Sequence, residues 1–215
     1  MWRSLPILVL NLLVSLGIQA QYTASDWEDR DQWMKTGTLL QLMDLNQGSR
    51  VADIGCHEGY LSMHLSKSVG ADGRVYAVDV RSDRLETLRS NANDRKLRNI
   101  ITILGDYDDP KLPKDELDAV FIIDTYHEMD SHEKILRHVK SSLKSGGKLM
   151  LLEKLKKRVV GKSRREQVTA HSLGPEYVRD ELRDAGFNII SEVEDHGDWE
   201  HETSKQMWFI VAQKP

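Results

Sequence analysis

The stretch that decides the fold reads Asp53-Ile54-Gly55-Cys56-His57-Glu58-Gly59-Tyr60, in a chain of 215 residues. Residues 50–54, which overlap its start, predict a strand, and residues 60–69, which begin at its end, predict an amphipathic helix. Glycine at positions 55 and 59 permits a tight turn and a close approach of the backbone to a ligand. The helix that follows presents free N–H groups and a positive dipole end. The stretch therefore predicts a ligand-binding turn between a strand and a helix.

Strands and helices continue to alternate on the C-terminal side of this turn. Further strands are predicted at residues 74–78, 100–104, 117–123 and 148–152, with helices beginning near residues 83, 130 and 175. Two final strands, 187–193 and 207–212, have no helix between them and must pair antiparallel, because a parallel pair needs a crossover of about a dozen residues or more. The predicted fold is α/β, Rossmann-like and doubly wound, with a mostly parallel seven-stranded sheet and an antiparallel C-terminal strand pair.

Three local expectations accompany this fold. Residues 27–43 predict one helix or two short ones, and residues 194–206 predict a loop. Asp130 is expected to cap the helix that follows it, with Glu133 three residues on as a capping-box partner.

Composition narrows the class of protein. Hydrophobic residues make up 40% and charged residues 30% of the chain, which is typical of a globular domain. The net charge of −4 gives no overall attraction to nucleic acid, so no nucleic-acid partner is expected. A single cysteine, Cys56, excludes an internal disulfide, and its apolar surroundings predict a buried small residue.

The first twenty residues differ from the rest. Arg3 precedes a mostly apolar run that ends at Ala20, which is the charged, apolar, small order of a secretory signal peptide. An uncleaved anchor and a folded helix are the alternatives. The predicted division is therefore 1–20 signal peptide, 21–49 N-terminal helical segment and 50–215 catalytic domain, and the protein is expected to be exported, periplasmic or secreted.

Carboxylates around the turn indicate which cofactor it binds. A dinucleotide loop needs the pattern G-x-G-x-x-G, and counting from Gly55 this chain has His57 and Tyr60 where glycine is required. A sulfonium cofactor instead needs an acid near its ammonium group and a second acid for its ribose hydroxyls. Asp53 and Glu58 flank the loop, Asp79 ends the second predicted strand, and Asp106 follows the third. Each such acid can also be only a helix cap or a solvated loop residue.

The segments VADIGCHEGY, VYAVDV, ITILGDYDD, LDAVFIIDTYHEM and LKSGGKLMLLEK resemble, in this order, the class I S-adenosyl-L-methionine (SAM)-dependent methyltransferases. The resemblance covers residues 51–153 and implies SAM as the cofactor. It implies that the amino-acid end of SAM is held by Asp53, Gly55 and Gly59, the ribose hydroxyls by Asp79 and the adenine amino group by Asp106. His57 occupies the position of the usual middle glycine of the loop and is counted with the cofactor-binding residues.

The sequence contains fewer indications of which residues act on the methyl acceptor. His127 directly follows the fourth predicted strand and is the candidate catalytic residue, a general base whose ordinary pKa of ~6.5 lies near the working pH. A histidine that only packs is the alternative. His127, Glu128 and His171 are also a weak metal signal, because their spacing is not that of a close fixed motif, and no metal is expected.

Two further segments have a functional and a structural interpretation. Seven basic residues between positions 154 and 165 predict either a lid that attracts an anionic substrate or lipid headgroup, or a solvated loop: Lys154, Lys156, Lys157, Arg158, Lys162, Arg164 and Arg165. Trp27 and Trp33 either close over a ligand or pack on the edge of the sheet.

The predicted function is transfer of the SAM methyl group to a small-molecule or lipid-like acceptor. The alternative is an exported SAM-binding module without transferase activity, since SAM is made in the cytoplasm and its supply outside is uncertain. Membrane association has only weak support. The sequence does not identify the acceptor atom.

Overall fold

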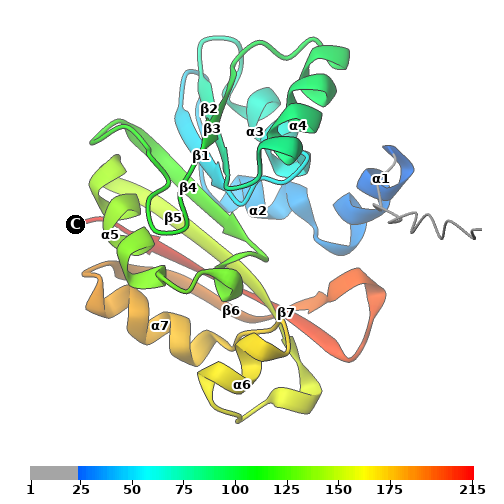
Figure 1. Ribbon diagram of the computed structural model, residues 1–215, viewed down its shortest axis with the longest axis vertical. Coiled ribbons are helices and arrows are strands. Elements are labelled where there is room, and N and C mark those ends of the chain that lie inside the picture. The colour runs from blue at the N-terminus through cyan, green and yellow to red at the C-terminus, as the bar shows by residue number, and fades with distance from the viewer. Residues whose placement is uncertain (1–23) are drawn as a thin grey trace, which may run out of the picture.

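Seven strands form one sheet within residues 24–215, the part of the chain that this computed structural model describes (Figure 1). They are β1 (Arg50–Ile54), β2 (Arg74–Asp79), β3 (Ile100–Leu104), β4 (Leu117–Ile123), β5 (Leu143–Lys156), β6 (Asn188–Asp198) and β7 (Lys205–Gln213). Their spatial order is β3-β2-β1-β4-β5-β7-β6. The first five are parallel, and β7 runs antiparallel to both β5 and β6. The predicted fold class is confirmed.

Helices cover both faces of this sheet (Figure 1). The helices of the described residues are α1 (Ala24–Trp33), α2 (Thr36–Leu42), α3 (Tyr60–Val69), α4 (Ser82–Asp94), α5 (His132–Ser142), α6 (Arg164–Thr169) and α7 (Pro175–Asp184), with short 3₁₀ turns η1 (Tyr126–Glu128), η2 (Lys157–Val159) and η3 (Trp199–His201). Because successive side chains of a strand point to opposite faces, Val51 belongs to the core under α2 to α4 and Ala52 to the core under α5 and α7.

Strand β5 is longer than the predicted residues 148–152. Residues Lys148 to Leu152 pair with β4 on one side, but pairing with β7 on the other side continues to Lys156. The antiparallel partner therefore supports a strand that projects beyond the parallel part of the sheet. Glu153 and Lys154 lie on this projection.

The predicted cap of α5 was wrong, and so was the predicted loop at residues 194–206, because β6 continues to Asp198 and η3 (Trp199–His201) follows it directly. Helix α5 begins after Ser131 without a side-chain cap, so Asp130 and Glu133 form no capping box. Of the two interpretations of the basic segment, a plain loop does not hold, because the segment contains the end of β5, η2 and the start of helix α6. Ser163 and Glu166 form a capping box at the start of α6, which fixes that helix at the end of the basic run.

Two short helices, α1 and α2, occupy the segment predicted as one helix or two. Cys56 is buried, as expected. The predicted signal peptide at residues 1–20 lies outside the described residues. Among residues 24–215, no helix combines the length and the hydropathy needed to span a membrane.

Candidate cofactor and acceptor site

The turn between β1 and α3 depends on two glycines with left-handed backbones. Gly55 has φ 77°, and a Cβ built on it would lie 2.5 Å from Cγ2 of Thr125, which directly follows Asp124 at the end of β4. Gly59 has φ 90° and is the N-cap residue directly before α3, and a Cβ built on it would lie 2.6 Å from Cγ of Leu88 in α4. Only glycine tolerates both the conformation and the lack of space. Gly55 therefore lets the turn approach β4, and Gly59 lets it approach α4.

His57 also has a left-handed backbone, with φ 50°. This explains why glycine is usual at its position in the family that the sequence resembles. Its main-chain N–H donates to Oδ2 of Asp79, 2.9 Å away. Burial, followed by the charge of Arg84, lowers the pKa of the His57 ring, so the ring is neutral at pH 7.

Asp79 closes the turn from the end of β2. Its Oδ2 accepts from the N–H of His57, and its Oδ1 accepts from the N–H of Arg81 at 2.9 Å. The carboxylate is thus held by two main-chain donors and is half-buried. Its position beside the turn is fixed by the backbone.

Asp53 lies deeper and is fully enclosed. Its Oδ2 accepts from the hydroxyl of Ser62, 2.6 Å away. Burial raises the pKa of Asp53 to about 6, although the Ser62 hydrogen bond and the charge of Arg30 oppose the shift. A buried acid that ionises at this pH is suited to receiving a cationic group from a ligand.

A cavity of about 480 Å³ opens above this turn, within the usual range for small-molecule sites of ~300–1,000 Å³. Five of the six predicted cofactor-binding residues line it: Asp53, Gly55, His57, Asp79 and Asp106. Gly59 does not, because it faces α4. Asp106 is exposed, and Nζ of Lys111 lies 3.0 Å from its carboxylate.

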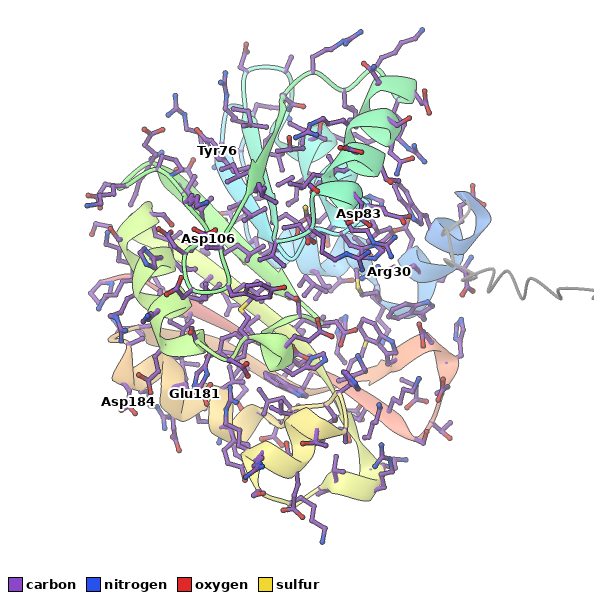
Figure 2. All side chains as sticks on the ribbon, viewed as in Figure 1. Arg30, Tyr76, Asp83, Asp106, Glu181 and Asp184 are labelled. Atoms are coloured by element: carbon purple, nitrogen blue, oxygen red, sulfur yellow. The ribbon has the colours of Figure 1, made fainter. Side chains whose placement is uncertain are left out.

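One wall of the cavity is mainly aromatic. It contains Trp27, Arg30, Tyr60 and Trp199. The sequence did not predict that these side chains lie together. The Arg30 guanidinium lies 4.3 Å from the centre of the Tyr60 ring, and Nε of Arg30 is buried without a hydrogen-bond partner among the described residues. Arg30 enters the site from α1, whereas Asp106 enters from the segment after β3 (Figure 2).

The two tryptophans singled out in the sequence have different positions. Trp27 lines the cavity, with its ring centroid 5.7 Å from that of Tyr60. Trp33 is buried and packs against Trp199, with ring centroids 4.6 Å apart. Trp199 lies in the segment predicted as a plain loop, so no local pattern linked it to α1.

At the acceptor end, His127 is buried and held by Glu153 of β5. Its main-chain N–H donates to Oε1 at 3.0 Å, and its ring Nδ1 lies 2.8 Å from Oε2. Burial opposes the charged ring, but the hydrogen bond and charge of Glu153 outweigh it and raise the pKa of His127. The sequence missed Glu153, and its only signal was an acid directly after the apolar run Leu151-Leu152.

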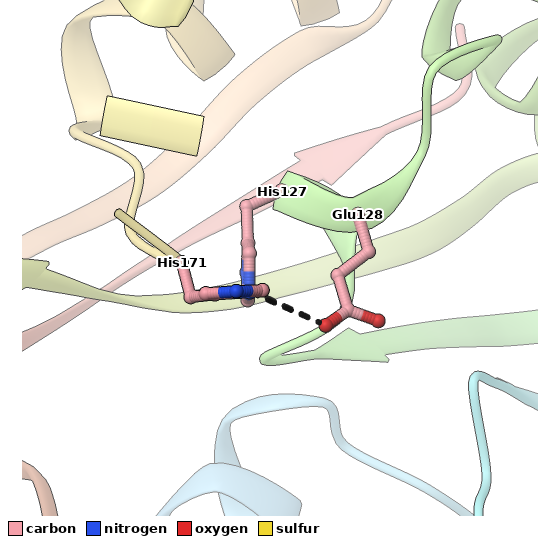
Figure 3. Close-up of side chains that lie close together, drawn as sticks. All are labelled: His127, Glu128 and His171. Carbon is pink, nitrogen blue, oxygen red and sulfur yellow. Dashed lines mark ion pairs between the residues drawn. The ribbon is translucent and has the colours of Figure 1, made fainter. Parts of the chain in front are cut away.

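Glu128 lies near Nε2 of the His127 ring, and His171 lies close to both residues (Figure 3). Oε1 of Glu128 is 3.9 Å from Nε2 of His127 and 3.8 Å from Nδ1 of His171. Glu128 lines the cavity, whereas His127 and His171 do not. His196 and His201 are elsewhere: His196 bonds the carbonyl of Met34, and His201 faces Asp29.

The basic segment does not line the cavity. Lys154 pairs with Asp124 and Lys156 donates to the carbonyl of Ala170, so both have protein partners. The exposed members of the run point to solvent around η2 and α6: Lys157, Arg158, Lys162 and Arg165.

Fold and cavity together define the class: a Rossmann-like domain whose cofactor cavity lies at the carboxyl ends of its parallel strands. Residues 51–147 match the family model described as "Methyltransferase domain". This part of the chain is therefore a class I methyltransferase domain, a class whose cofactor is SAM.

Named relatives agree with this assignment. The chain is similar to aklanonic acid methyltransferase DauC of Streptomyces sp. (strain C5), with 34% identity over 83 residues that cover 37% of this chain and 38% of that protein. It is also similar to the ubiquinone/menaquinone biosynthesis C-methyltransferase UbiE of Azotobacter vinelandii, with 29% identity over 53% of this chain and 46% of that protein. The chain thus matches less than half of the length of these two curated relatives.

Solved structures share the fold. A SAM-dependent methyltransferase from Aquifex aeolicus superposes with a TM-score of 0.73 at 24% identity, covering 91% of this chain and 100% of that one. Phosphoethanolamine N-methyltransferase 2 of Haemonchus contortus, in complex with SAM, gives a TM-score of 0.68 at 15% identity, covering 92% and 58%.

Proposed function

We propose that this protein transfers the methyl group of SAM to a small-molecule acceptor. The observation that carries the proposal is that Asp53, Asp79 and Asp106, which are far apart in the sequence, line one cavity beside the Gly55 turn. SAM, when bound, supplies an electrophilic methyl group on a sulfonium. The residues of this chain would hold the two reactants in line for displacement, so that catalysis rests mainly on positioning.

The described residues fit this cofactor. Asp53 would receive the α-ammonium group, because it is a buried carboxylate beside the turn. Arg30 fits the α-carboxylate, since its buried Nε is without a partner among the described residues. Asp79 would accept from the ribose hydroxyls and Asp106 from the adenine amino group. The main-chain atoms of Gly55 and His57 would contact the cofactor. Gly59 would not contact it but would position α3.

His127 is the proposed catalytic residue at the acceptor end. Glu153 accepts from its Nδ1 and leaves Nε2 to act on the acceptor, in the simplest case by taking a proton from a hydroxyl, amine or thiol. His127 is buried and does not line the cavity, and Glu128 is the lining residue next to its Nε2, so an acceptor would have to reach it past Glu128.

For the acceptor we propose a small or lipid-like molecule that is anionic. The relatives named above act on aklanonic acid and in quinone biosynthesis, as their names state. The exposed basic residues around η2 and α6 support an anionic acceptor, since their positive charge would attract it. This attraction would act at long range, because none of these residues lines the cavity. The same residues provide weak support for contact with a lipid surface.

We also propose that the protein is exported after cleavage near Gln21, on the basis of the sequence order at residues 1–20. Mass spectrometry of the native protein would then find a mature N-terminus near Gln21. An intact Met1 in a soluble cytoplasmic pool would contradict this proposal.

The function is tested by incubating the mature protein with methyl-labelled SAM and fractionated cell extract. Label is expected to move into a small-molecule fraction with the wild-type chain and to fall with Asp79→Ala. SAM binding measured by calorimetry without any labelled product from any fraction would favour the alternative, a binding module. Failure to bind SAM would overturn the proposal.

A further inference from the structure

Three side chains meet at the acceptor end of the cavity, where Glu128 lines it, and their ligand atoms lie close together. The ring nitrogens of His127 and His171 and a carboxylate oxygen of Glu128 all lie within 4.8 Å of one another (Figure 3). Two imidazoles and one carboxylate are a donor set that binds divalent metal ions in catalytic sites. We propose that His127, Glu128 and His171 bind one divalent metal ion of the zinc class.

The hydrogen bond to Glu153 prepares His127 for this role. A carboxylate that accepts from Nδ1 of His127 places a proton on that nitrogen, so Nε2 is the atom whose lone pair is available when the ring is neutral. Nε2 is the atom that faces Glu128. A carboxylate behind a ligating histidine fixes the ring and raises its basicity, and this arrangement is usual for metal-binding histidines.

Distances show which ligands must move. Bonds of ~2.0–2.1 Å to a tetrahedral zinc ion place the ligand atoms roughly 3.3 Å apart. The separations of 3.9 Å and 3.8 Å to Glu128 are therefore slightly wide. His127 is fixed, but the side chains of Glu128 and His171 are 62% and 72% exposed, so both are free to close on an ion.

A second set of possible ligands, Asp124, His127 and Glu153, is already satisfied by protein partners. Asp124 pairs with Lys154, and both oxygens of Glu153 accept from His127. An ion there would have to displace a cation and two hydrogen bonds. The site on the Nε2 side of His127 needs no such exchange.

The ion has a defined task in the function proposed above, on which this part of the inference rests. Glu128 lines the cavity, so a metal ion bound to it borders the acceptor. With Nε2 of His127 bound to the ion, the ion would take over the role proposed for that nitrogen, and an acceptor hydroxyl or thiol bound to it would lose its proton to water more readily. Its oxygen or sulfur then forms the bond to the methyl carbon while the C–S bond breaks, and the electron pair of that bond stays on the sulfur of the demethylated product.

Metal binding is tested on the full chain without cofactor. Co²⁺, followed by its visible absorption, and Zn²⁺, followed by calorimetry, are each expected to bind one to one. His171→Asn and Glu128→Gln should each weaken binding at least tenfold, because loss even of an outer-shell partner costs ~10–100-fold. Both residues are exposed, so these variants should fold even if His127→Ala does not.

His138→Asn is the matched control, because His138 is an exposed histidine that faces Asp109 and lies in α5 outside this group. It should bind both ions like the wild type. Absence of one-to-one binding, or binding that His171→Asn leaves unchanged, would overturn the proposal.

SAM binding is measured on the same samples and separates the two proposals. His171→Asn should keep the wild-type affinity for SAM, since His171 does not line the cavity. A chain that binds Co²⁺ but not SAM would refute the proposed function and leave the metal site standing. A chain that binds SAM but no metal ion would refute the metal site and leave the proposed function standing.

Discussion

The cofactor end and the acceptor end of the cavity are positioned by different parts of the chain. At the cofactor end the main chain does most of the work: Gly55 and His57 have left-handed backbones, and the N–H groups of His57 and Arg81 hold Asp79. At the acceptor end, side chains hold one another, as Glu153 holds His127. Backbone requirements leave glycines at fixed spacing in the sequence, whereas side-chain contacts between distant elements leave no fixed pattern.

This comparison predicts that substitutions at the two ends of the cavity have different consequences, for turnover at one end and for SAM affinity at the other. The largest change is expected for turnover, from a substitution at the acceptor end. His127→Ala should lower turnover roughly 10²–10⁴-fold, the usual range for loss of a general acid or base, and leave SAM affinity nearly unchanged. Turnover needs the acceptor found in the extract screen, and SAM affinity is measured by calorimetry.

His138→Ala serves as the control, because it removes an exposed histidine elsewhere. If His127→Ala unfolds the domain, the residue has a packing role. Normal turnover in a folded variant would show that positioning alone suffices.

The opposite pattern is expected for Asp79. Asp79→Ala should weaken SAM binding about tenfold to a hundredfold, because a hydrogen bond to a charged group is worth ~1.5–3 kcal/mol. Asp83→Ala is the matched control, since Asp83 is exposed and pairs with Arg81 beside the same strand end. Equal SAM affinity of the Asp79 variant and the wild type would remove this residue from the site.

A smaller effect is expected from Asp53 in the chain without cofactor. Its folded-state pKa of about 6 lies above the ordinary value of 3.8, so the folded chain binds the proton more tightly than the unfolded chain. The stability that this proton contributes is fully present below the unfolded pKa and is lost as pH rises through about 6. Between pH 7 and pH 5 the gain is about 1 kcal/mol.

Thermal unfolding of the wild type and of Asp53→Asn across this pH range measures the effect. Burial also raises the pKa of Asp124, so the difference between the two proteins, rather than the wild-type curve, isolates Asp53. A difference in Tm that does not change with pH would mean that Asp53 keeps its ordinary pKa.

The sequence predicted the sheet because each strand is an apolar run bounded by turn residues, and it predicted the cofactor end because Gly55 and Gly59 obey a backbone constraint. The sequence did not predict the helix caps correctly, because two segments of the chain have the spacing of a capping box. Ser163 and Glu166 have the capping-box spacing just as Asp130 and Glu133 do, but the surrounding basic residues favoured a loop. Caps depend on where a helix packs, which the local sequence does not contain.

The acceptor end was only partly predictable for the same reason. His127 was found because it directly follows a strand, a position that topology alone assigns to the site. Its partner Glu153 lies in β5 and His171 lies after α6, so their convergence depends on the long projection of β5 and on the placement of α6. A long-range contact of this kind has no signature in residue spacing.

The contact between α1 and the β6–β7 hairpin has a consequence for how the protein matures. Trp33 packs on Trp199, Nζ of Lys35 donates to the carbonyl of His196, and that histidine in turn bonds the carbonyl of Met34. The aromatic wall therefore joins the first and last parts of the described chain. During synthesis the glycine turn can form early, but the wall must wait until Trp199 has been made. Contacts so distant in sequence close slowly, which makes binding to the complete cavity a late event in folding.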